Sequence, residues 1–110
     1  MEPRKRVLLH YVDSRGVDVF REWIEHLEDL RGRAAILKRL DRVAEGLLGD
    51  HRYIGKGVWE LRIHFGPGYR VYYAEDSHTI ILLLLGGDKG SQARNIHYAQ
   101  TFLEEYRRAF

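Results

Sequence analysis

The chain of 110 residues contains no cysteine, which excludes disulfide bonds, thiolate metal ligands and a cysteine nucleophile. Long apolar runs are also missing. The longest, from Ile80 to Leu85, is far shorter than the roughly 20 residues of a membrane-spanning helix. The charged N-terminus, Met1 to Arg6, is not followed by an apolar segment typical of a signal peptide. We therefore expect a soluble cytoplasmic protein with a single domain over residues 1–110.

A strong charge of one sign is missing as well, because the net charge is only +2. The distribution of charge is more informative. Fourteen of the 18 basic residues are arginine, whose guanidinium group binds phosphate in a forked geometry. Between His51 and Tyr73 the only acid is Glu60, whereas the basic residues there are Arg52, Lys56, Arg62 and Arg70. This stretch is either an ordinary solvated face or a surface that binds phosphate groups.

Two segments have apolar residues at helical spacing. They run from Val17 to Leu30 and from about Arg33 to Leu48, and the short link between them predicts an antiparallel helix hairpin. A third helix is expected from Gln92 to about Arg108.

The apolar period changes to two after residue 58, where Trp59, Leu61, Ile63 and Phe65 alternate with polar residues. This pattern predicts a strand with one buried and one polar face. Further strands are expected at Arg6–Tyr11, Tyr69–Ala74 and Thr79–Leu85. The predicted fold is α+β in the order β-α-α-β-β-β-α, with the hairpin packed on a mainly antiparallel four-stranded sheet. The position of the first strand in that sheet stays open.

Strand alternation places Glu60, Arg62 and His64 on one face, away from the apolar set. Arg70 and Tyr72 are expected on the same face of the neighbouring strand, and Lys89 at the end of the third strand of the meander lies close by. The sequence therefore predicts an exposed, concave sheet surface with several ionisable groups.

Cleavage of RNA by its own 2′-hydroxyl group is a reaction that such a surface suits. It needs cations for the phosphate, a base for the hydroxyl and an acid for the leaving oxygen. Arg62, Arg70 and Lys89 would bind the phosphate, and His64 is a candidate acid or base because histidine titrates near neutral pH. Glu60 is an alternative base. No metal or other cofactor is expected, since the acids and histidines show no ligand spacing.

Two stretches resemble a known family. Residues 57–73, GVWELRIHFGPGYRVYY, and residues 82–92, LLLLGGDKGSQ, are similar to "addiction module killer" proteins of the RelE/ParE superfamily of type II toxins, which includes HigB-like members and phage-derived relatives. The resemblance extends over nearly the whole element order and implies a single RelE-like toxin domain with a C-terminal helix.

The resemblance implies a ribosome-dependent, metal-independent mRNA endonuclease that inhibits translation. Its partners would be the ribosome, mRNA and an antitoxin encoded in the same operon, and no membrane is involved. Functional residues carry over at Arg62, Arg70 and Lys89, whose positions match basic site residues of RelE-like toxins. His64 and Glu60 carry over less directly, as candidates for the catalytic acid or base. RNA contacts are expected at Arg52, Lys56 and Tyr72.

Two alternatives stay open at this point. ParE-like members of the superfamily inhibit DNA gyrase by binding and cut no RNA, and an inactive chain could persist as an antitoxin-binding subunit. In either toxin class we expect an apolar patch for the antitoxin, with exposed aromatic residues near Trp23, Tyr53 or Phe110.

Overall fold

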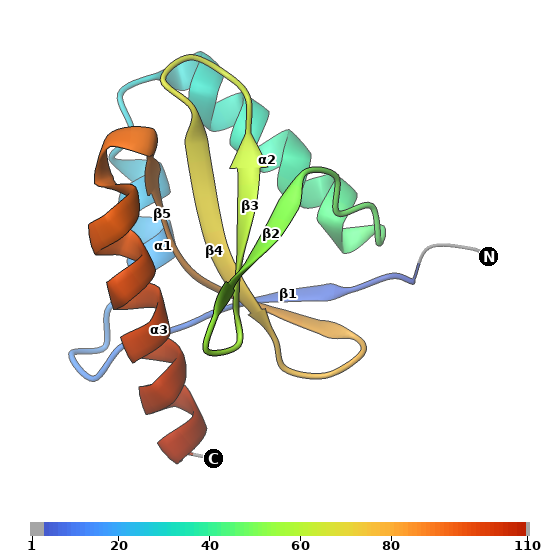
Figure 1. The fold of residues 1–110 in the computed structure, drawn as a ribbon. Coiled ribbons are helices and arrows are strands. Elements are labelled where there is room, and N and C mark those ends of the chain that lie inside the picture. Colours follow the sequence, from blue (N-terminus) through green and yellow to red (C-terminus); the bar gives the residue numbers. More distant parts are fainter. Residues whose placement is uncertain (1–3, 110) are drawn as a thin grey trace.

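The computed structural model describes residues 4–109, so Phe110 of the expected antitoxin patch lies outside the described residues. The chain forms strand β1, helices α1 and α2, strands β2 to β5, a 3₁₀ turn η1 and helix α3 (Figure 1). Their bounds are β1 Val7–His10, α1 Val19–Glu25, α2 Leu30–Ala44, β2 His51–Gly55, β3 Val58–Ile63, β4 Tyr69–Glu75, β5 Ile80–Asp88, η1 Lys89–Ser91 and α3 Gln92–Ala109.

The sheet has five strands in the order β1-β5-β4-β3-β2, not the four expected. The additional strand is β2, which pairs antiparallel with β3 and places Tyr53 opposite Trp59. The first strand, whose position the sequence left open, lies at the other edge and runs parallel to β5. The meander of β3, β4 and β5 is antiparallel as predicted.

The two N-terminal helices cover one face of the sheet, but the antiparallel hairpin that was expected differs in detail, because the two helices pack mainly on the sheet rather than on each other. Helix α1 lies against β5 and β1, whereas α2 lies against β3. Their bounds also differ from the prediction, because two aspartates begin the helices. Asp18 accepts a hydrogen bond from the backbone of Arg21, and Asp29 accepts one from the backbone of Gly32.

The main core lies between these two helices and the sheet. Leu61 and Ile63 are buried there with Phe20, Ile24, Leu40 and Val43, as the alternation predicts, and Trp59 is half-buried against the same cluster. The strand and the face that it buries are therefore confirmed as far as Ile63, but β3 ends there, and Phe65, expected in the same buried set, is 37% exposed in the turn that follows.

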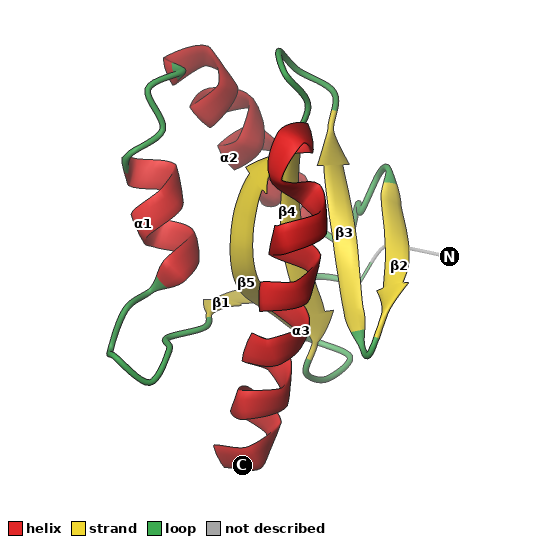
Figure 2. Ribbon diagram, turned by 60° about the vertical axis from the view of Figure 1, so that its left-hand side comes forward, coloured by secondary structure: helices red, strands yellow, loops and turns green. Residues whose placement is uncertain are grey.

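The opposite face of the sheet is not the open concave surface that was expected, because α3 covers it (Figure 2). Ala99 and Leu103 of α3 pack on Val58, Tyr72 and Leu84 and make a second core. Glu60 and Tyr72, both expected at the surface, are fully buried. The polar face of β3 is thus exposed only toward the end of the strand.

Two consecutive glycines at the end of β5 allow helices to approach both faces of the sheet. A Cβ on Gly86 would lie 2.3 Å from the Trp23 ring of α1. A Cβ on Gly87 would lie 2.0 Å from the Asn95 side-chain nitrogen of α3. The Gly-Gly pair therefore brings α1 and the start of α3 close to β5, next to Lys89. Among the described residues, no helix has the length and apolar character needed to cross a membrane.

Candidate functional site

The candidate site lies at the end of the sheet where three elements meet. The turn between β3 and β4, the end of β5 and the start of α3 gather at the top of Figure 1. Arg62 on β3 is directly opposite Arg70 on β4, and Arg70 is opposite Gly87 on β5. Paired residues in a sheet share a face, so both arginines project on the side of α3. Gly87 has no side chain and leaves room beside them.

Glu60 holds these arginines together. One carboxylate oxygen, Oε1, accepts hydrogen bonds from Nε of Arg62 at 3.0 Å and from Nη1 of Arg70 at 2.9 Å. The other oxygen, Oε2, accepts from the Tyr72 hydroxyl at 3.1 Å and from Nε2 of Gln92 at 3.0 Å. The Glu60 side chain is fully enclosed. Each oxygen thus has two donors, and one buried anion positions two guanidinium groups.

The ionisation of Glu60 follows from these contacts. Burial alone would raise the pKa of its carboxyl group, but the hydrogen bonds from Arg62 and Gln92 and the charge of Arg70 outweigh burial and lower the pKa. Burial and the neighbouring Glu60 charge raise the pKa of the Tyr72 hydroxyl. Glu60 is therefore a carboxylate and Tyr72 a neutral donor at neutral pH.

The two arginines differ in exposure. The Arg62 side chain is 29% exposed and that of Arg70 is 11% exposed. Both line a shallow depression of about 460 Å³ together with His64 and Lys89, and the Phe65–Gly68 turn forms its remaining wall. The structure therefore brings together four of the predicted site residues, Arg62, Arg70, His64 and Lys89. Two guanidinium groups share one carboxylate, so the depression keeps an excess of positive charge.

A backbone hydrogen bond between two distant segments positions Lys89 at the depression. Its amide donates to the Gly68 carbonyl at 2.9 Å, which ties η1 to the β3–β4 turn. Asp88 begins η1 by accepting a hydrogen bond from the Ser91 amide. The exposed Lys89 side chain is thus placed by two elements that do not depend on its charge.

His64 lies at the outer rim, just beyond β3. Its Nε2 is 2.5 Å from Oδ2 of Asp50, and the side chain is 75% exposed. The hydrogen bond from His64 lowers the pKa of the Asp50 carboxyl group. Arg39 of α2 supports this rim, because its guanidinium donates to the backbone carbonyls of Arg62 and Asp50. A carboxylate therefore orients the one imidazole of the depression.

The remaining predicted residues are not part of this depression. Lys56 lies in the β2–β3 turn, at the opposite end of β3, and lines a separate hollow with Arg107 and Arg108 of α3. Arg52 is opposite Glu60 on the edge strand β2 and is exposed. Tyr72 is fully enclosed, so its hydroxyl contacts Glu60 and is not a surface group for RNA.

Sequence reasoning missed three residues that shape the site: Gln92, Asp50 and Arg39. Gln92 begins α3 and reaches Glu60 across 32 positions of sequence, so no local pattern indicates the contact. Asp50 directly precedes β2, the strand that was not predicted, and Arg39 lies on α2 and reaches the end of β3 through the Arg62 carbonyl, 23 positions along the chain.

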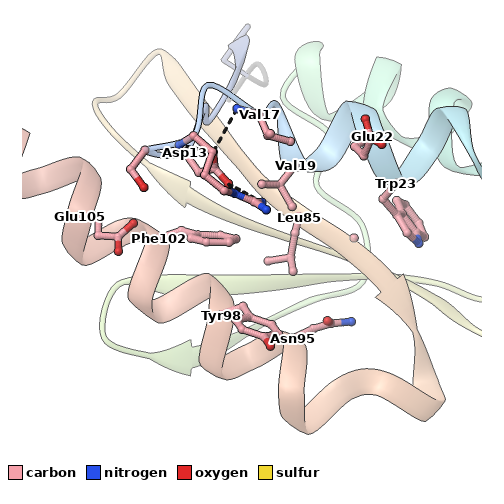
Figure 3. Close-up of a pocket in the computed structure, with 13 residues that line it drawn as sticks. Asp13, Val17, Val19, Glu22, Trp23, Leu85, Asn95, Tyr98, Phe102 and Glu105 are labelled. Carbon is pink, nitrogen blue, oxygen red and sulfur yellow. Dashed lines mark hydrogen bonds and ion pairs between the residues drawn. The ribbon is translucent and has the colours of Figure 1, made fainter.

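A groove of about 620 Å³ between α1 and α3 is larger than the basic depression and separate from it. In Figure 3 the side chain of Val19 points into it from the α1 side and those of Phe102 and Tyr98 from α3, with Leu85 of β5 between them. Trp23, one of the aromatic residues expected at a partner surface, lines the groove. Tyr53, another of them, lies on β2, away from it.

Comparisons with known proteins show which family the chain belongs to. The model of the family described as "Phage derived protein Gp49-like (DUF891)" matches residues 22–107, which include the β3–β4 turn, the Gly-Gly pair and most of α3. A protein of Haemophilus influenzae described as an "uncharacterized protein" is 38% identical over 86 residues, covering 78% of this chain and 87% of the relative. This chain belongs to the phage-derived Gp49-like family.

Proposed function

We propose that this chain is the toxin of a type II toxin–antitoxin pair and that it cleaves messenger RNA bound to the ribosome. The observation that carries the proposal is the buried Glu60 carboxylate, which holds Arg62 and Arg70 side by side next to Lys89. Burying a carboxylate is costly unless cations and hydrogen bonds compensate it. Here the cations of Arg62 and Arg70 compensate the burial of Glu60, and the same contacts hold the two guanidinium groups in position to bind a phosphate.

The reaction proposed is the attack of a 2′-hydroxyl group on the adjacent phosphate. The 2′-oxygen forms a bond to phosphorus while the bond from phosphorus to the 5′-oxygen breaks, which leaves a 2′,3′-cyclic phosphate and a 5′-hydroxyl. The proton of the 2′-hydroxyl goes to a base, and the leaving oxygen takes a proton from an acid. Negative charge grows on the phosphate oxygens during the step, and groups already held in place stabilise that charge most effectively.

Each residue of the depression has a place in this scheme. Arg62, Arg70 and Lys89 bind the phosphate and stabilise its developing charge. His64 makes one of the two proton transfers, and Asp50 orients its ring. The second transfer falls to a group of the ribosome or of the RNA.

Glu60 takes no proton in this scheme. Both of its carboxylate oxygens already accept two hydrogen bonds and the side chain is enclosed, so it does not meet the 2′-hydroxyl. It acts instead as a positioning residue for the arginines, and Tyr72 acts through it. Exposed Arg52 and Lys56 remain candidates for contacts with RNA farther from the scissile phosphate.

The proposal includes a partner. A type II toxin is neutralised by a protein encoded beside it, and we assign that role to the product of the adjacent gene. The complex would keep the chain inactive until the antitoxin is lost.

Induction of the chain in cells, followed by mapping of mRNA ends and measurement of plasmid supercoiling, tests the proposal. We expect new mRNA ends within translated regions and unchanged supercoiling. Growth arrest with altered supercoiling and intact mRNA would favour a gyrase inhibitor instead. Normal growth with no new mRNA ends would favour the other alternative, an inactive subunit that binds an antitoxin.

A further inference from the structure

The groove between α1 and α3 has a floor and walls that are largely apolar. Val19 and Trp23 of the α1 side face Tyr98 and Phe102 of α3, with Leu85 of β5 between them (Figure 3). The Tyr98 side chain remains 46% exposed although its ring stacks on Phe102, with centroids 6.3 Å apart and planes at 17°. Exposed aromatic rings in a concave apolar site are typical of protein-binding surfaces.

The rim of the groove is acidic. Asp13, Glu22 and Glu105 line it, together with one cation, Arg15. The guanidinium group of Arg15 is bound to Asp13 at 2.8 and 3.1 Å, so these two charges neutralise each other. Glu22 and Glu105 remain as an excess of negative charge on opposite sides of the groove, one on α1 and one on α3.

The charge and dimensions of the groove indicate its occupant. An acidic rim repels the phosphates of RNA and attracts basic side chains. The wall formed by α3 runs from Asn95 to Glu105, which corresponds to roughly 15 Å at the rise of an α-helix. That length suits a helical segment of about ten residues with apolar side chains on one face and lysine or arginine at its flanks.

We infer that the groove between α1 and α3 is the docking site for a basic amphipathic helix of the antitoxin. This inference rests on the partner assigned under the proposed function, but not on the cleavage chemistry. Gly86 and Asn95 line the groove, and Gly87, the next residue, lies opposite Arg70 in the sheet. A bound helix would therefore contact the end of β5 and the start of α3, close to the loop that carries Lys89.

Two pairs of matched variants test the docking site with the full chain and the purified product of the adjacent gene. Tyr98→Ala removes an exposed aromatic side chain from the groove, and Tyr53→Ala removes a similarly exposed one (52%) from β2. Glu22→Gln with Glu105→Gln neutralises the rim. The control, Glu25→Gln with Glu104→Gln, also removes one charge each from α1 and α3, but outside the groove.

Titration calorimetry gives the Kd of each variant at low and at moderate salt. We expect Tyr98→Ala to raise the Kd about tenfold or more, as for an aromatic residue at the centre of an interface. Glu22→Gln with Glu105→Gln should raise the Kd at low salt and make the Kd less dependent on salt concentration. Both controls should stay within about twofold of the wild type, with thermal unfolding used to confirm that all variants fold.

Each other outcome contradicts the inference. If the antitoxin binds tightly and the groove variants change the Kd no more than the control variants do, the antitoxin docks elsewhere on the chain. The proposal that it is the partner would then remain. Self-association of the wild type that Tyr98→Ala abolishes would make a second copy of the chain the occupant. Failure of the adjacent gene product to bind at all would refute the partner and the docking site together, whereas mRNA cleavage would be judged independently.

Discussion

The Oε1 atom of Glu60 lies 2.9 Å from Nη1 of Arg70, and the carboxylate is fully enclosed between the sheet and α3. The ion pair belongs to both the fold and the candidate site, because the same oxygen binds Arg62. Truncation of either arginine to alanine would therefore change stability as well as chemistry. This coupling decides which variants separate the two roles.

Removal of the buried anion should destabilise the fold strongly. Glu60→Ala leaves two guanidinium groups facing each other without a counter-charge, and Nε of Arg70 is already buried without a hydrogen bond among the described residues. Loss of one partner of a buried ion pair costs about 3–5 kcal/mol. Urea unfolding should show a decrease of this size, and Glu60→Gln, which keeps the shape, should lose less. A decrease below about 1 kcal/mol for Glu60→Ala would mean that the pair is not enclosed in solution.

The stability of the fold should fall in acid partly through Glu60. The pKa of Glu60 is lowered from its usual value of 4.5 in the folded state, so the carboxylate stabilises the fold above that pH. This contribution is lost as pH falls below 4.5 and through the folded-state pKa. Asp13, Asp29 and Asp50 also have lowered pKa values and add to the acid sensitivity. The difference between wild type and Glu60→Gln, measured by unfolding from pH 7 to pH 3, isolates Glu60, and a constant difference would contradict its ionisation.

A methyl group at position 87 should disturb the placement of α3 and η1. The added Cβ would lie 2.0 Å from the Asn95 side-chain nitrogen and 2.8 Å from the Ser91 hydroxyl, so the start of α3 must shift. Gly87→Ala should therefore lower the thermal stability and reduce mRNA cleavage. Gly90→Ala is the matched control, since its Cβ meets one carboxylate oxygen at 3.3 Å. Equal effects of the two substitutions would show that close packing at Gly87 is unimportant.

His64 should control the pH dependence of cleavage. If it transfers a proton, His64→Ala lowers the rate by about 10²-fold or more and removes the pH dependence near neutrality. Asp50→Asn keeps a group that can contact the ring but removes the carboxylate that orients it, so it should lower the rate less than His64→Ala does. Single-turnover rates from pH 5.5 to pH 8.5 measure both effects. A profile that is the same for wild type and His64→Ala would assign the proton transfer to the ribosome.

Much of the fold follows from local patterns. Alternation from Trp59 to Phe65 predicted which side of β3 faces the helices, and Leu61 and Ile63 are buried there. Strand β2 was not predictable in this way, because its residues His51, Arg52 and Tyr53 are exposed at the sheet edge and show no apolar alternation. An edge strand is determined by its partner rather than by its own burial.

The cations of the candidate site and the face on which Glu60 lies were predictable, but the burial of Glu60 was not. Arg62, Arg70 and Lys89 could be identified from strand spacing and the Gly-Gly loop, and they line one depression. The enclosure of Glu60 depends on α3 and on Gln92, a residue far along the chain. Alternation gave the face of Glu60 correctly, but it contains no information about which element covers that face.

The most direct measurement of the central claim compares two lysine variants in cleavage of a defined mRNA on purified ribosomes. Lys89→Gln removes a cation from the depression without breaking the Glu60 network, and Lys56→Gln removes the same charge at the opposite end of β3. We expect Lys89→Gln to lower the single-turnover rate at saturating ribosomes about 10²-fold, or about 3 kcal/mol of transition-state stabilisation. Lys56→Gln should keep the wild-type rate at saturation. Wild-type cleavage by Lys89→Gln, or no cleavage by the wild type, would contradict the assignment of this depression as the site of RNA cleavage.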